Sequence, residues 1–249
     1  MPKISPHHPR AESLRIREKI VAGFRSGMVV PEGLAAHGRG EAFDYLLGER
    51  TSEEARRAIK AAAALMLLSY QPVISVNGNS AALVPDEMVR LSKLTGARIE
   101  VNLFHRTKKR LEKIKKWLKA HGATEVLGTE KKFCTRIPEI HSERRVVDQR
   151  GIATADVVFI PLEDGDRAEA LKKLGKKIIA VDLNPMSRTA RAADITIVDN
   201  IVRAMPLLVE EAERFSSKQK EELQHIVEGF DNRENLNAML KLMSESARI

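Results

Sequence analysis

Polar residues that suit anion binding follow two of the apolar runs in this sequence. Asn77, Gly78 and Asn79 come directly after one run, and His105 and Arg106 end or follow the next. Glycine permits a tight turn, asparagine offers hydrogen-bond donors and acceptors, and the forked arginine guanidinium pairs with phosphate or carboxylate. We therefore expect Arg106 to bind an anionic group, although an arginine beside a lysine-rich segment can also be a surface residue.

A later run is followed by two carboxylates, Glu163 and Asp164, close to the start of an expected helix. Carboxylates in such a place could hold Mg²⁺ or an ammonium group. The sequence leaves the choice between these two roles open, and it identifies no metal ligand.

Acidic residues also stand at the ends of the last two runs. Asp182 precedes a turn that carries Ser187 and Arg188, and Asp199 precedes Asn200. An aspartate at a strand end can accept hydrogen bonds from ribose hydroxyls, while serine and arginine can meet phosphate. Either aspartate could instead only cap a helix, but two polar strand ends in succession favour a nucleotide site.

Arginines near the start of the chain provide a further candidate. On a helical wheel, Arg10 and Arg17 fall inside an apolar arc that is formed by Leu14, Ile20, Val21, Phe24 and Met28. An unpaired buried charge is costly, so both arginines need a partner, which could be a bound polyphosphate or an internal carboxylate. Arg39 lies between two glycines, which free the backbone to approach a ligand closely.

These residues need a scaffold that brings the ends of the apolar runs together. Strands are expected over residues 73–76, 98–104, 125–127, 157–161, 177–183 and 195–198. Helices are expected over residues 86–95, 107–121, 167–174 and 200–215. Strand and helix alternation predicts an α/β fold with a largely parallel, doubly wound sheet, in which ligands bind beyond the carboxyl ends of the strands.

Helical extensions flank this core on both sides. We expect a helical N-terminal arm over residues 1–50 that contributes to the nucleotide site, a core over 51–215, and C-terminal helices over 216–249 that provide a possible dimer contact. The longest irregular segment, 128–150, is basic, and a loop of that length is more often functional than idle.

Composition narrows the class of protein. The longest apolar run, 61–68, is far shorter than the roughly 20 residues of a membrane helix, so we expect a cytoplasmic protein without membrane contact. A single cysteine, Cys134, excludes an internal disulfide. The net charge of +8 fits nucleic acid or several small anions. The chain has neither the G-x-G-x-x-G pattern nor a P-loop, which disfavours a standard dinucleotide fold.

Several segments together resemble the archaeal phosphopantothenate synthetase family, the 4-phosphopantoate--beta-alanine ligases. The resemblance covers essentially the whole chain, and its longest motifs lie in the second half. It is carried by His8-Pro9-Arg10, Val76-Asn77-Gly78-Asn79, Leu162-Glu163-Asp164-Gly165-Asp166-Arg167, Asp182-Leu183-Asn184-Pro185-Met186-Ser187-Arg188-Thr189 and Ile197-Val198-Asp199-Asn200-Ile201.

The resemblance implies a Rossmann-like homodimer that condenses 4-phosphopantoate with β-alanine and splits ATP, with Mg²⁺, to AMP and pyrophosphate through an acyl adenylate. It implies ATP contacts at Arg17, Arg39, Val181, Asp182, Leu183, Ser187, Arg188, Asp199, Asn200 and Ile201. From their positions in the fold we assign phosphopantoate to Arg10, Asn77, Asn79 and Arg106, and the chemistry to His105 and Arg106. The base that deprotonates β-alanine stays open among His105, Glu163 and Asp164.

Two other classes of function are compatible with parts of the sequence. A nucleotide-dependent oxidoreductase or transferase could use the same fold, but the glycine fingerprint is missing. A nucleic-acid-binding module would explain the lysines of residues 108–119. Those lysines lie on an ordinary amphipathic helix, however, and an aromatic content of 4% offers few platforms for base stacking. We therefore expect no nucleic acid partner.

Overall fold

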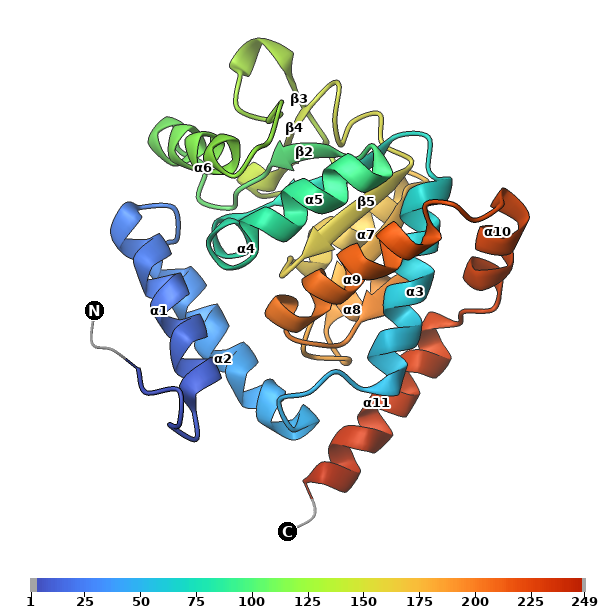
Figure 1. The fold of residues 1–249 in the computed structure, drawn as a ribbon. Helices are drawn as coiled ribbons and strands as arrows, with labels where there is room; N and C mark the ends of the chain where they lie inside the picture. Colours follow the sequence, from blue (N-terminus) through green and yellow to red (C-terminus); the bar gives the residue numbers. More distant parts are fainter. Residues whose placement is uncertain (1–3, 248–249) are drawn as a thin grey trace.

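A five-stranded sheet lies at the centre of the computed structural model, which describes residues 4–247 (Figure 1). Its strands run in the order β2-β1-β5-β6-β7, and every neighbouring pair is parallel. The order reverses between β1 and β5, as in doubly wound sheets. The predicted Rossmann-like α/β fold is confirmed. The strands are β1 Pro72–Val76, β2 Arg98–Val101, β5 Val157–Pro161, β6 Lys177–Val181 and β7 Ile195–Ile197.

The strands are apolar on both sides because helices cover both faces of the sheet. On one face, Ile74, Phe159 and Ile179 belong to the main apolar core. The helices over this face are α3 Glu53–Leu68, α4 Gly78–Leu83, α5 Pro85–Thr95, α6 Lys108–Ala120 and α9 Ile201–Phe215.

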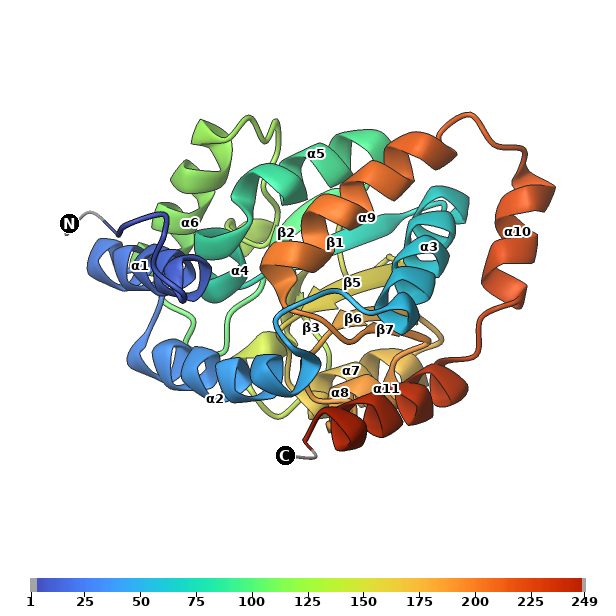
Figure 2. The same cartoon turned by 60° about the horizontal axis from the view of Figure 1, so that its bottom comes forward.

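The opposite face has a smaller core, which includes Val158 and Ile178. It is covered by α7 Gly165–Lys173, α8 Arg188–Ala192 and the segment that carries the two-stranded antiparallel sheet of β3 Cys134–Arg136 and β4 Val146–Asp148. Figure 2 shows the sheet between the layer of α5 and α9 and the layer of α7 and α8.

Most expected elements are present with shifted ends, but two expectations were wrong. Residues 125–127 form no strand of the sheet: Leu127 makes only an isolated parallel bridge to Glu100 at the edge of β2. Segment 128–150 is not irregular throughout, because it contains β3, β4 and two 3-10 turns, Lys131–Phe133 and Glu143–Arg145. The expected strands 98–104 and 177–183 end earlier, at Val101 and Val181.

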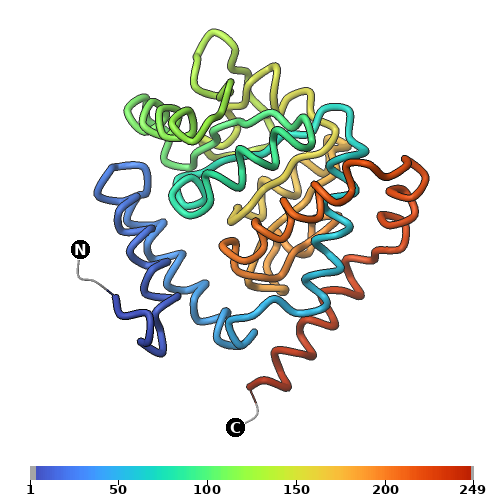
Figure 3. Tube along the Cα trace, in the orientation of Figure 1, coloured from blue at the N-terminus to red at the C-terminus, as the bar shows by residue number. Residues whose placement is uncertain are grey.

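The helical extensions occur at both ends, as predicted. The N-terminal arm consists of α1 Ala11–Ser26 and α2 Pro31–Leu47, and the C-terminal pair is α10 Lys220–Glu228 and α11 Asn232–Ser246. Figure 3 follows the chain from this arm through the core to the C-terminal pair, which packs against α3. Helix α11 also contacts α2 and α8. The expected boundaries near residues 50 and 216 fall in the loops that follow α2 and α9.

Among residues 4–247, no helix is both long enough and apolar enough to cross a membrane.

Substitution of Gly128 by alanine should destabilise the fold through a collision at the edge of β2. Gly128 has φ of 74°, and a Cβ there would lie 2.5 Å from the carbonyl oxygen of Val101. Gly175 has a similar φ of 78° and open space around it. Both substitutions carry the left-handed penalty of about 1–2 kcal/mol, so Gly175→Ala is a matched control. Gly128→Ala should cost about 1–3 kcal/mol more. Equal Tm values for the two variants, measured by thermal denaturation, would contradict the collision.

Candidate functional site

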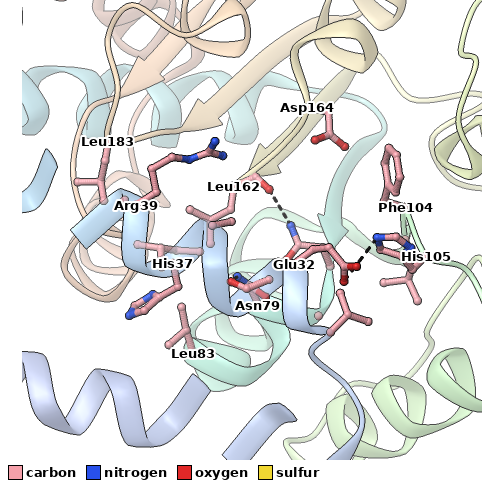
Figure 4. A pocket seen from close by; sticks show the side chains of 18 of the residues that line it. Glu32, His37, Arg39, Asn79, Leu83, Phe104, His105, Leu162, Asp164 and Leu183 are labelled. Carbon is pink, nitrogen blue, oxygen red and sulfur yellow. Dashed lines mark hydrogen bonds and ion pairs between the residues drawn. The ribbon is translucent and has the colours of Figure 1, made fainter. Parts of the chain in front are cut away.

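A cavity of about 380 Å³ lies beyond the carboxyl ends of the central strands, and α2 forms its opposite wall (Figure 4). The cavity includes the point where the strand order reverses, between β1 and β5, which is where ligands bind in sheets of this kind. Of the candidate residues named from the sequence, those that line the cavity are Arg39, Asn77, Gly78, Asn79, His105, Asp164, Leu183, Asn200 and Ile201.

Because Gly78 has no side chain, the loop at Met28 and the side chain of Arg110 can pack closely against the end of β1. A Cβ on Gly78 would collide with the carbonyl oxygen of Met28 and would lie 2.9 Å from Nη2 of Arg110. Next to it, Nδ2 of Asn79 donates a hydrogen bond of 2.8 Å to the carbonyl oxygen of Gly33. The turn after β1 therefore holds the beginning of α2 against the strand ends.

The side chain of Asn77 ties the end of β1 to the end of β5. Its Nδ2 donates to the carbonyl oxygens of Pro161 (2.9 Å) and Leu162 (3.1 Å), and its Oδ1 accepts from the backbone N–H of Ser80. Leu162 has φ of 54°, a left-handed conformation that costs a bulky residue about 1–2 kcal/mol. Asn77 thus stabilises a strained turn, and its assignment to the substrate stays a prediction.

Two arginines that the sequence analysis missed, Arg110 and Arg144, line one end of the cavity. Arg110 donates to the carbonyl oxygen of Met28 through Nη2 (2.8 Å) and Nε (3.2 Å), and to that of His105 through Nη1. Burial lowers the pKa of Arg110, and the nearby Arg144 cation lowers it further. Two guanidinium groups at the same end of a cavity are suited to binding an anion.

The carboxylates after β5 bind Arg144. Nε of Arg144 lies 2.7 Å from Oδ2 of Asp164 and 2.8 Å from Oε1 of Glu163. Glu163 also binds Arg167, which is wholly buried. The residues that the structure describes form no cluster of three His, Cys, Asp or Glu side chains that could hold a metal ion.

Arg106 is not among the residues that line the cavity, and its assignment to the substrate stays a prediction. Its Nη2 donates to the carbonyl oxygen of Gly128 at 2.6 Å, and it lies beside Sγ of Cys134 at 3.6 Å. Arg110, four residues later and inside α6, does line the cavity. His105 does line the cavity, and its Nε2 lies 3.7 Å from Oε2 of Glu32 on α2, as Figure 4 shows.

Arg39 and Leu183 mark the other end of the cavity (Figure 4), together with Asn200 and Ile201. The acidic side chains of this end have protein partners. Asp182 accepts hydrogen bonds from the backbone N–H of Asn184 and from the hydroxyl of Ser187, and burial raises the pKa of its carboxyl. The neighbouring Arg188 is exposed and pairs with Glu169 at 2.7 Å.

Asp199 binds Oγ1 of Thr51 at 2.6 Å and Arg203, and burial raises its pKa as well. The carried-over nucleotide residues that do not line the cavity are Arg17, Val181, Asp182, Ser187, Arg188 and Asp199. Their assignment stays a prediction.

Arg10 and Arg17 share an internal carboxylate, Glu41, which lines the cavity. Arg17 makes a bidentate pair with it, through Nη2 (2.7 Å) and Nε (2.9 Å), and Arg10 approaches to 3.2 Å. The two arginines do not lie on a buried stripe: their side chains are 43% and 42% exposed.

The buried stripe of α1 includes Ile20, as predicted, but also small residues that a hydropathy pattern does not detect. Its members are Ala11, Ser13, Ile16, Ile20 and Gly23. A Cβ on Gly23 would lie 2.6 Å from Cβ of Ala82, so the backbone of α1 packs closely on α4. Phe24, which we placed on the apolar arc, is 40% exposed.

Known proteins resemble this chain along most of its length. A family model described as Phosphopantothenate/pantothenate synthetase matches residues 54–246. The chain is 53% identical to the 4-phosphopantoate--beta-alanine ligase of Thermococcus kodakarensis, over 96% of the chain and 92% of that protein. The ligase of the same name from Methanosarcina mazei is 51% identical, over 96% of the chain and 94% of that protein. That of Methanospirillum hungatei is 54% identical, over 81% of the chain and 82% of that protein.

Removal of the Glu41 charge should lower the thermal stability of the protein at neutral pH, and this effect should become smaller in acid. Burial raises the pKa of Glu41, but the hydrogen bond and the charge of Arg17 lower it below its usual value. A lowered carboxyl pKa gives stability that is complete above the unfolded value, about 4.3, and is lost as the pH falls through the folded value. Glu41→Gln should therefore lower Tm at pH 7, and its difference from the wild type should shrink in acid.

Thermal melts between pH 7 and pH 3.5 measure this difference. Glu12→Gln is the control, because Glu12 pairs with Arg15 on the same helix in an exposed position. A deficit for Glu41→Gln that is the same at every pH, or no larger than that for Glu12→Gln, would contradict the role of this ion pair.

Proposed function

We propose that this chain, which belongs to the phosphopantothenate/pantothenate synthetase family, joins 4-phosphopantoate to β-alanine. The observation that carries the proposal is the identity of about half of all residues, over 96% of the chain, to ligases of that name. The cavity supports it independently, because its two ends have different chemistry.

The two ends of the cavity suit the two anionic reactants. Arg110 and Arg144 converge at one end and match the phosphate of 4-phosphopantoate. Arg39 lies at the other end, where the exit of β6 and the beginning of α9 supply Leu183, Asn200 and Ile201 for a nucleotide. A substrate that spans the cavity would present its carboxylate, at the end opposite its phosphate, to the nucleotide.

The reaction needs an activated carboxylate, because oxide is too poor a leaving group for amide formation. In our proposal the carboxylate oxygen of 4-phosphopantoate attacks the α-phosphorus of ATP, and pyrophosphate leaves. The amine of β-alanine then attacks the acyl adenylate, and AMP leaves. Both steps depend mainly on positioning and on charge neutralisation, which the fixed arginines of the cavity supply.

The second step requires β-alanine to lose a proton from its ammonium group. His105 and Asp164 line the cavity, whereas the Glu163 carboxylate binds Arg144 and Arg167. We propose His105 as the base, because its ring lines the cavity and Glu32, which lies 3.7 Å from its Nε2, can orient the ring.

The described residues do not fit a protein site for Mg²⁺, since Glu163 and Asp164 pair with arginines and no cluster of three acidic or imidazole ligands exists among residues 4–247. We expect Mg²⁺ to be carried by the nucleotide phosphates, and we route no step through it.

We further propose that the enzyme is a homodimer of the cytoplasm. The arm offers contact surface for a second copy: Phe24 on α1 and Tyr45 on α2 are 40% and 47% exposed. Exposed aromatic residues are typical of protein interfaces.

Pyrophosphate exchange should test the order of the two chemical steps. If adenylation comes first, the protein should exchange labelled pyrophosphate into ATP with 4-phosphopantoate present and β-alanine absent, and the complete reaction should yield AMP. Pantoate or β-alanine alone should not support exchange. Accumulation of ADP and phosphate, or exchange that requires β-alanine, would exclude this mechanism.

Substitution of Arg110 should reduce the preference for 4-phosphopantoate over pantoate more than substitution of Arg106 does. Arg110→Lys keeps the positive charge but loses the fork, and charge-assisted hydrogen bonds contribute about 1.5–3 kcal/mol. We expect the ratio of kcat/KM for 4-phosphopantoate to that for pantoate to fall by roughly ten-fold or more. Arg106→Lys is the matched control, and it should change this ratio much less. A larger effect at Arg106 would restore our sequence-based assignment.

A further inference from the structure

We propose that Glu163 is a positioning residue that aims Arg144 at the substrate phosphate and thereby sets the preference for a phosphorylated acid. The inference rests on the proposed function, and it concerns a residue that does not line the cavity itself. Its physical basis is a buried Arg–Glu–Arg cluster, formed by Arg144, Glu163 and Arg167, directly behind the cavity wall.

Three donors fix the Glu163 carboxylate, whose side chain is 1% exposed. Oε2 accepts from Nη1 of Arg144 at 3.0 Å and from Nη1 of Arg167. Oε1 lies 2.8 Å from Nε of Arg144 and accepts from the backbone N–H of Asp164 at 3.0 Å. The carboxylate has no freedom to move without breaking several of these contacts.

The contacts with Glu163 determine which guanidinium nitrogen of Arg144 can bind a ligand. Nε binds Glu163 and Asp164, and Nη1 binds Glu163 and the carbonyl oxygen of Asn102 at 3.1 Å. Nη2 makes no hydrogen bond to any residue in the described range 4–247, while Arg144 lines the cavity. Glu163 therefore leaves one guanidinium nitrogen free, on a side chain whose direction is fixed.

Arg167 braces the carboxylate from the other side at an energetic cost. It is 0% exposed, and its Nε and Nη2 have no hydrogen-bond partner among the described residues. Replacement of a buried ionic cluster by apolar residues is often neutral or stabilising, so such a cluster is weak evidence for stability. Stability alone therefore does not explain why Arg167 is buried beside Glu163. A role of Glu163 in orienting Arg144 toward the cavity does explain it.

Contacts of the backbone also fix the position of Glu163. Leu162, just before it, is in the left-handed conformation that Asn77 stabilises. The carbonyl oxygen of Glu163 accepts a hydrogen bond of 2.9 Å from Oγ1 of Thr189. Strain of this kind persists where the surrounding structure over-determines it, typically at functional sites.

Glu163→Asp tests the role of position alone. The aspartate keeps the charge but is one methylene shorter, so it cannot hold both arginines in the present geometry. We expect the ratio of kcat/KM for 4-phosphopantoate to that for pantoate to fall by about ten-fold. Calorimetric affinity for 4-phosphopantoate, without ATP, should fall in parallel. Glu213→Asp is the matched control, because Glu213 pairs with Arg90 in an exposed ion pair, and it should leave the ratio unchanged.

A double-mutant cycle shows whether Glu163 acts through Arg144. Glu163→Asp should lower the ratio in the wild type and should add no further loss in an Arg144→Ala background, because coupled residues are not additive. If Arg144→Ala does not fold, Arg144→Lys takes its place. An unchanged ratio for Glu163→Asp, with or without a lower Tm, or an equal further loss in the Arg144 background, would overturn the inference. A wild type that uses neither substrate would instead refute the proposed function.

Discussion

The hydrogen bonds from the Asn77 side chain to the carbonyl oxygens of Pro161 and Leu162 connect the two strands between which the sheet reverses its order. Parallel strands leave their last carbonyl groups without partners where the chain turns away, and such groups are costly when buried. Asn77 satisfies two of them and also caps α4 through Ser80. The left-handed turn at Leu162, the direction of Glu163 and the position of Arg144 all follow from this connection.

A site for two polyanions has to keep several cations close together before either reactant arrives. Within residues 4–247, two of the three arginines that line the cavity are bonded to fixed acceptors: Arg110 to the carbonyl oxygens of Met28 and His105, and Arg144 to two carboxylates. Arg17 is held by Glu41 in the same way. These acceptors fix each guanidinium group but leave part of it open to a ligand. Little reorganisation is then needed when a phosphate binds, which is what electrostatic preorganisation means.

The sequence predicted where the site lies better than which side chains form it. Apolar runs that end in Asn77, Leu162 and Leu183 have to meet at one edge of a parallel sheet, and they do. Arg144 could not be found in this way, because its segment has no periodic hydropathy pattern. Its position at the cavity depends on hydrogen bonds to Asn102 and Glu163, which are distant in the sequence. Arg106 and Arg110 are equivalent in a hydropathy pattern, since both flank the start of α6. Only the carbonyl group of Met28, which comes from the distant arm, distinguishes them.

The stripe predicted for α1 was right for Ile20 and Met28, which are buried, and wrong for Phe24, for a different physical reason. Close helix packing selects small residues such as Ser13 and Gly23, and these have no apolar signal. The same limit applies to α2, whose buried residues in the structure are Asp44 and Leu47, both near its end. Asp44 binds Arg203 and Asn200, whereas the beginning of α2 is held by Asn79 and by the exposed pair of Glu32 and His105. The last turn of α2 is therefore anchored by buried charges, whereas its first turn depends on the part-buried hydrogen bond of Asn79 and on a solvent-screened ion pair, which contributes less to stability.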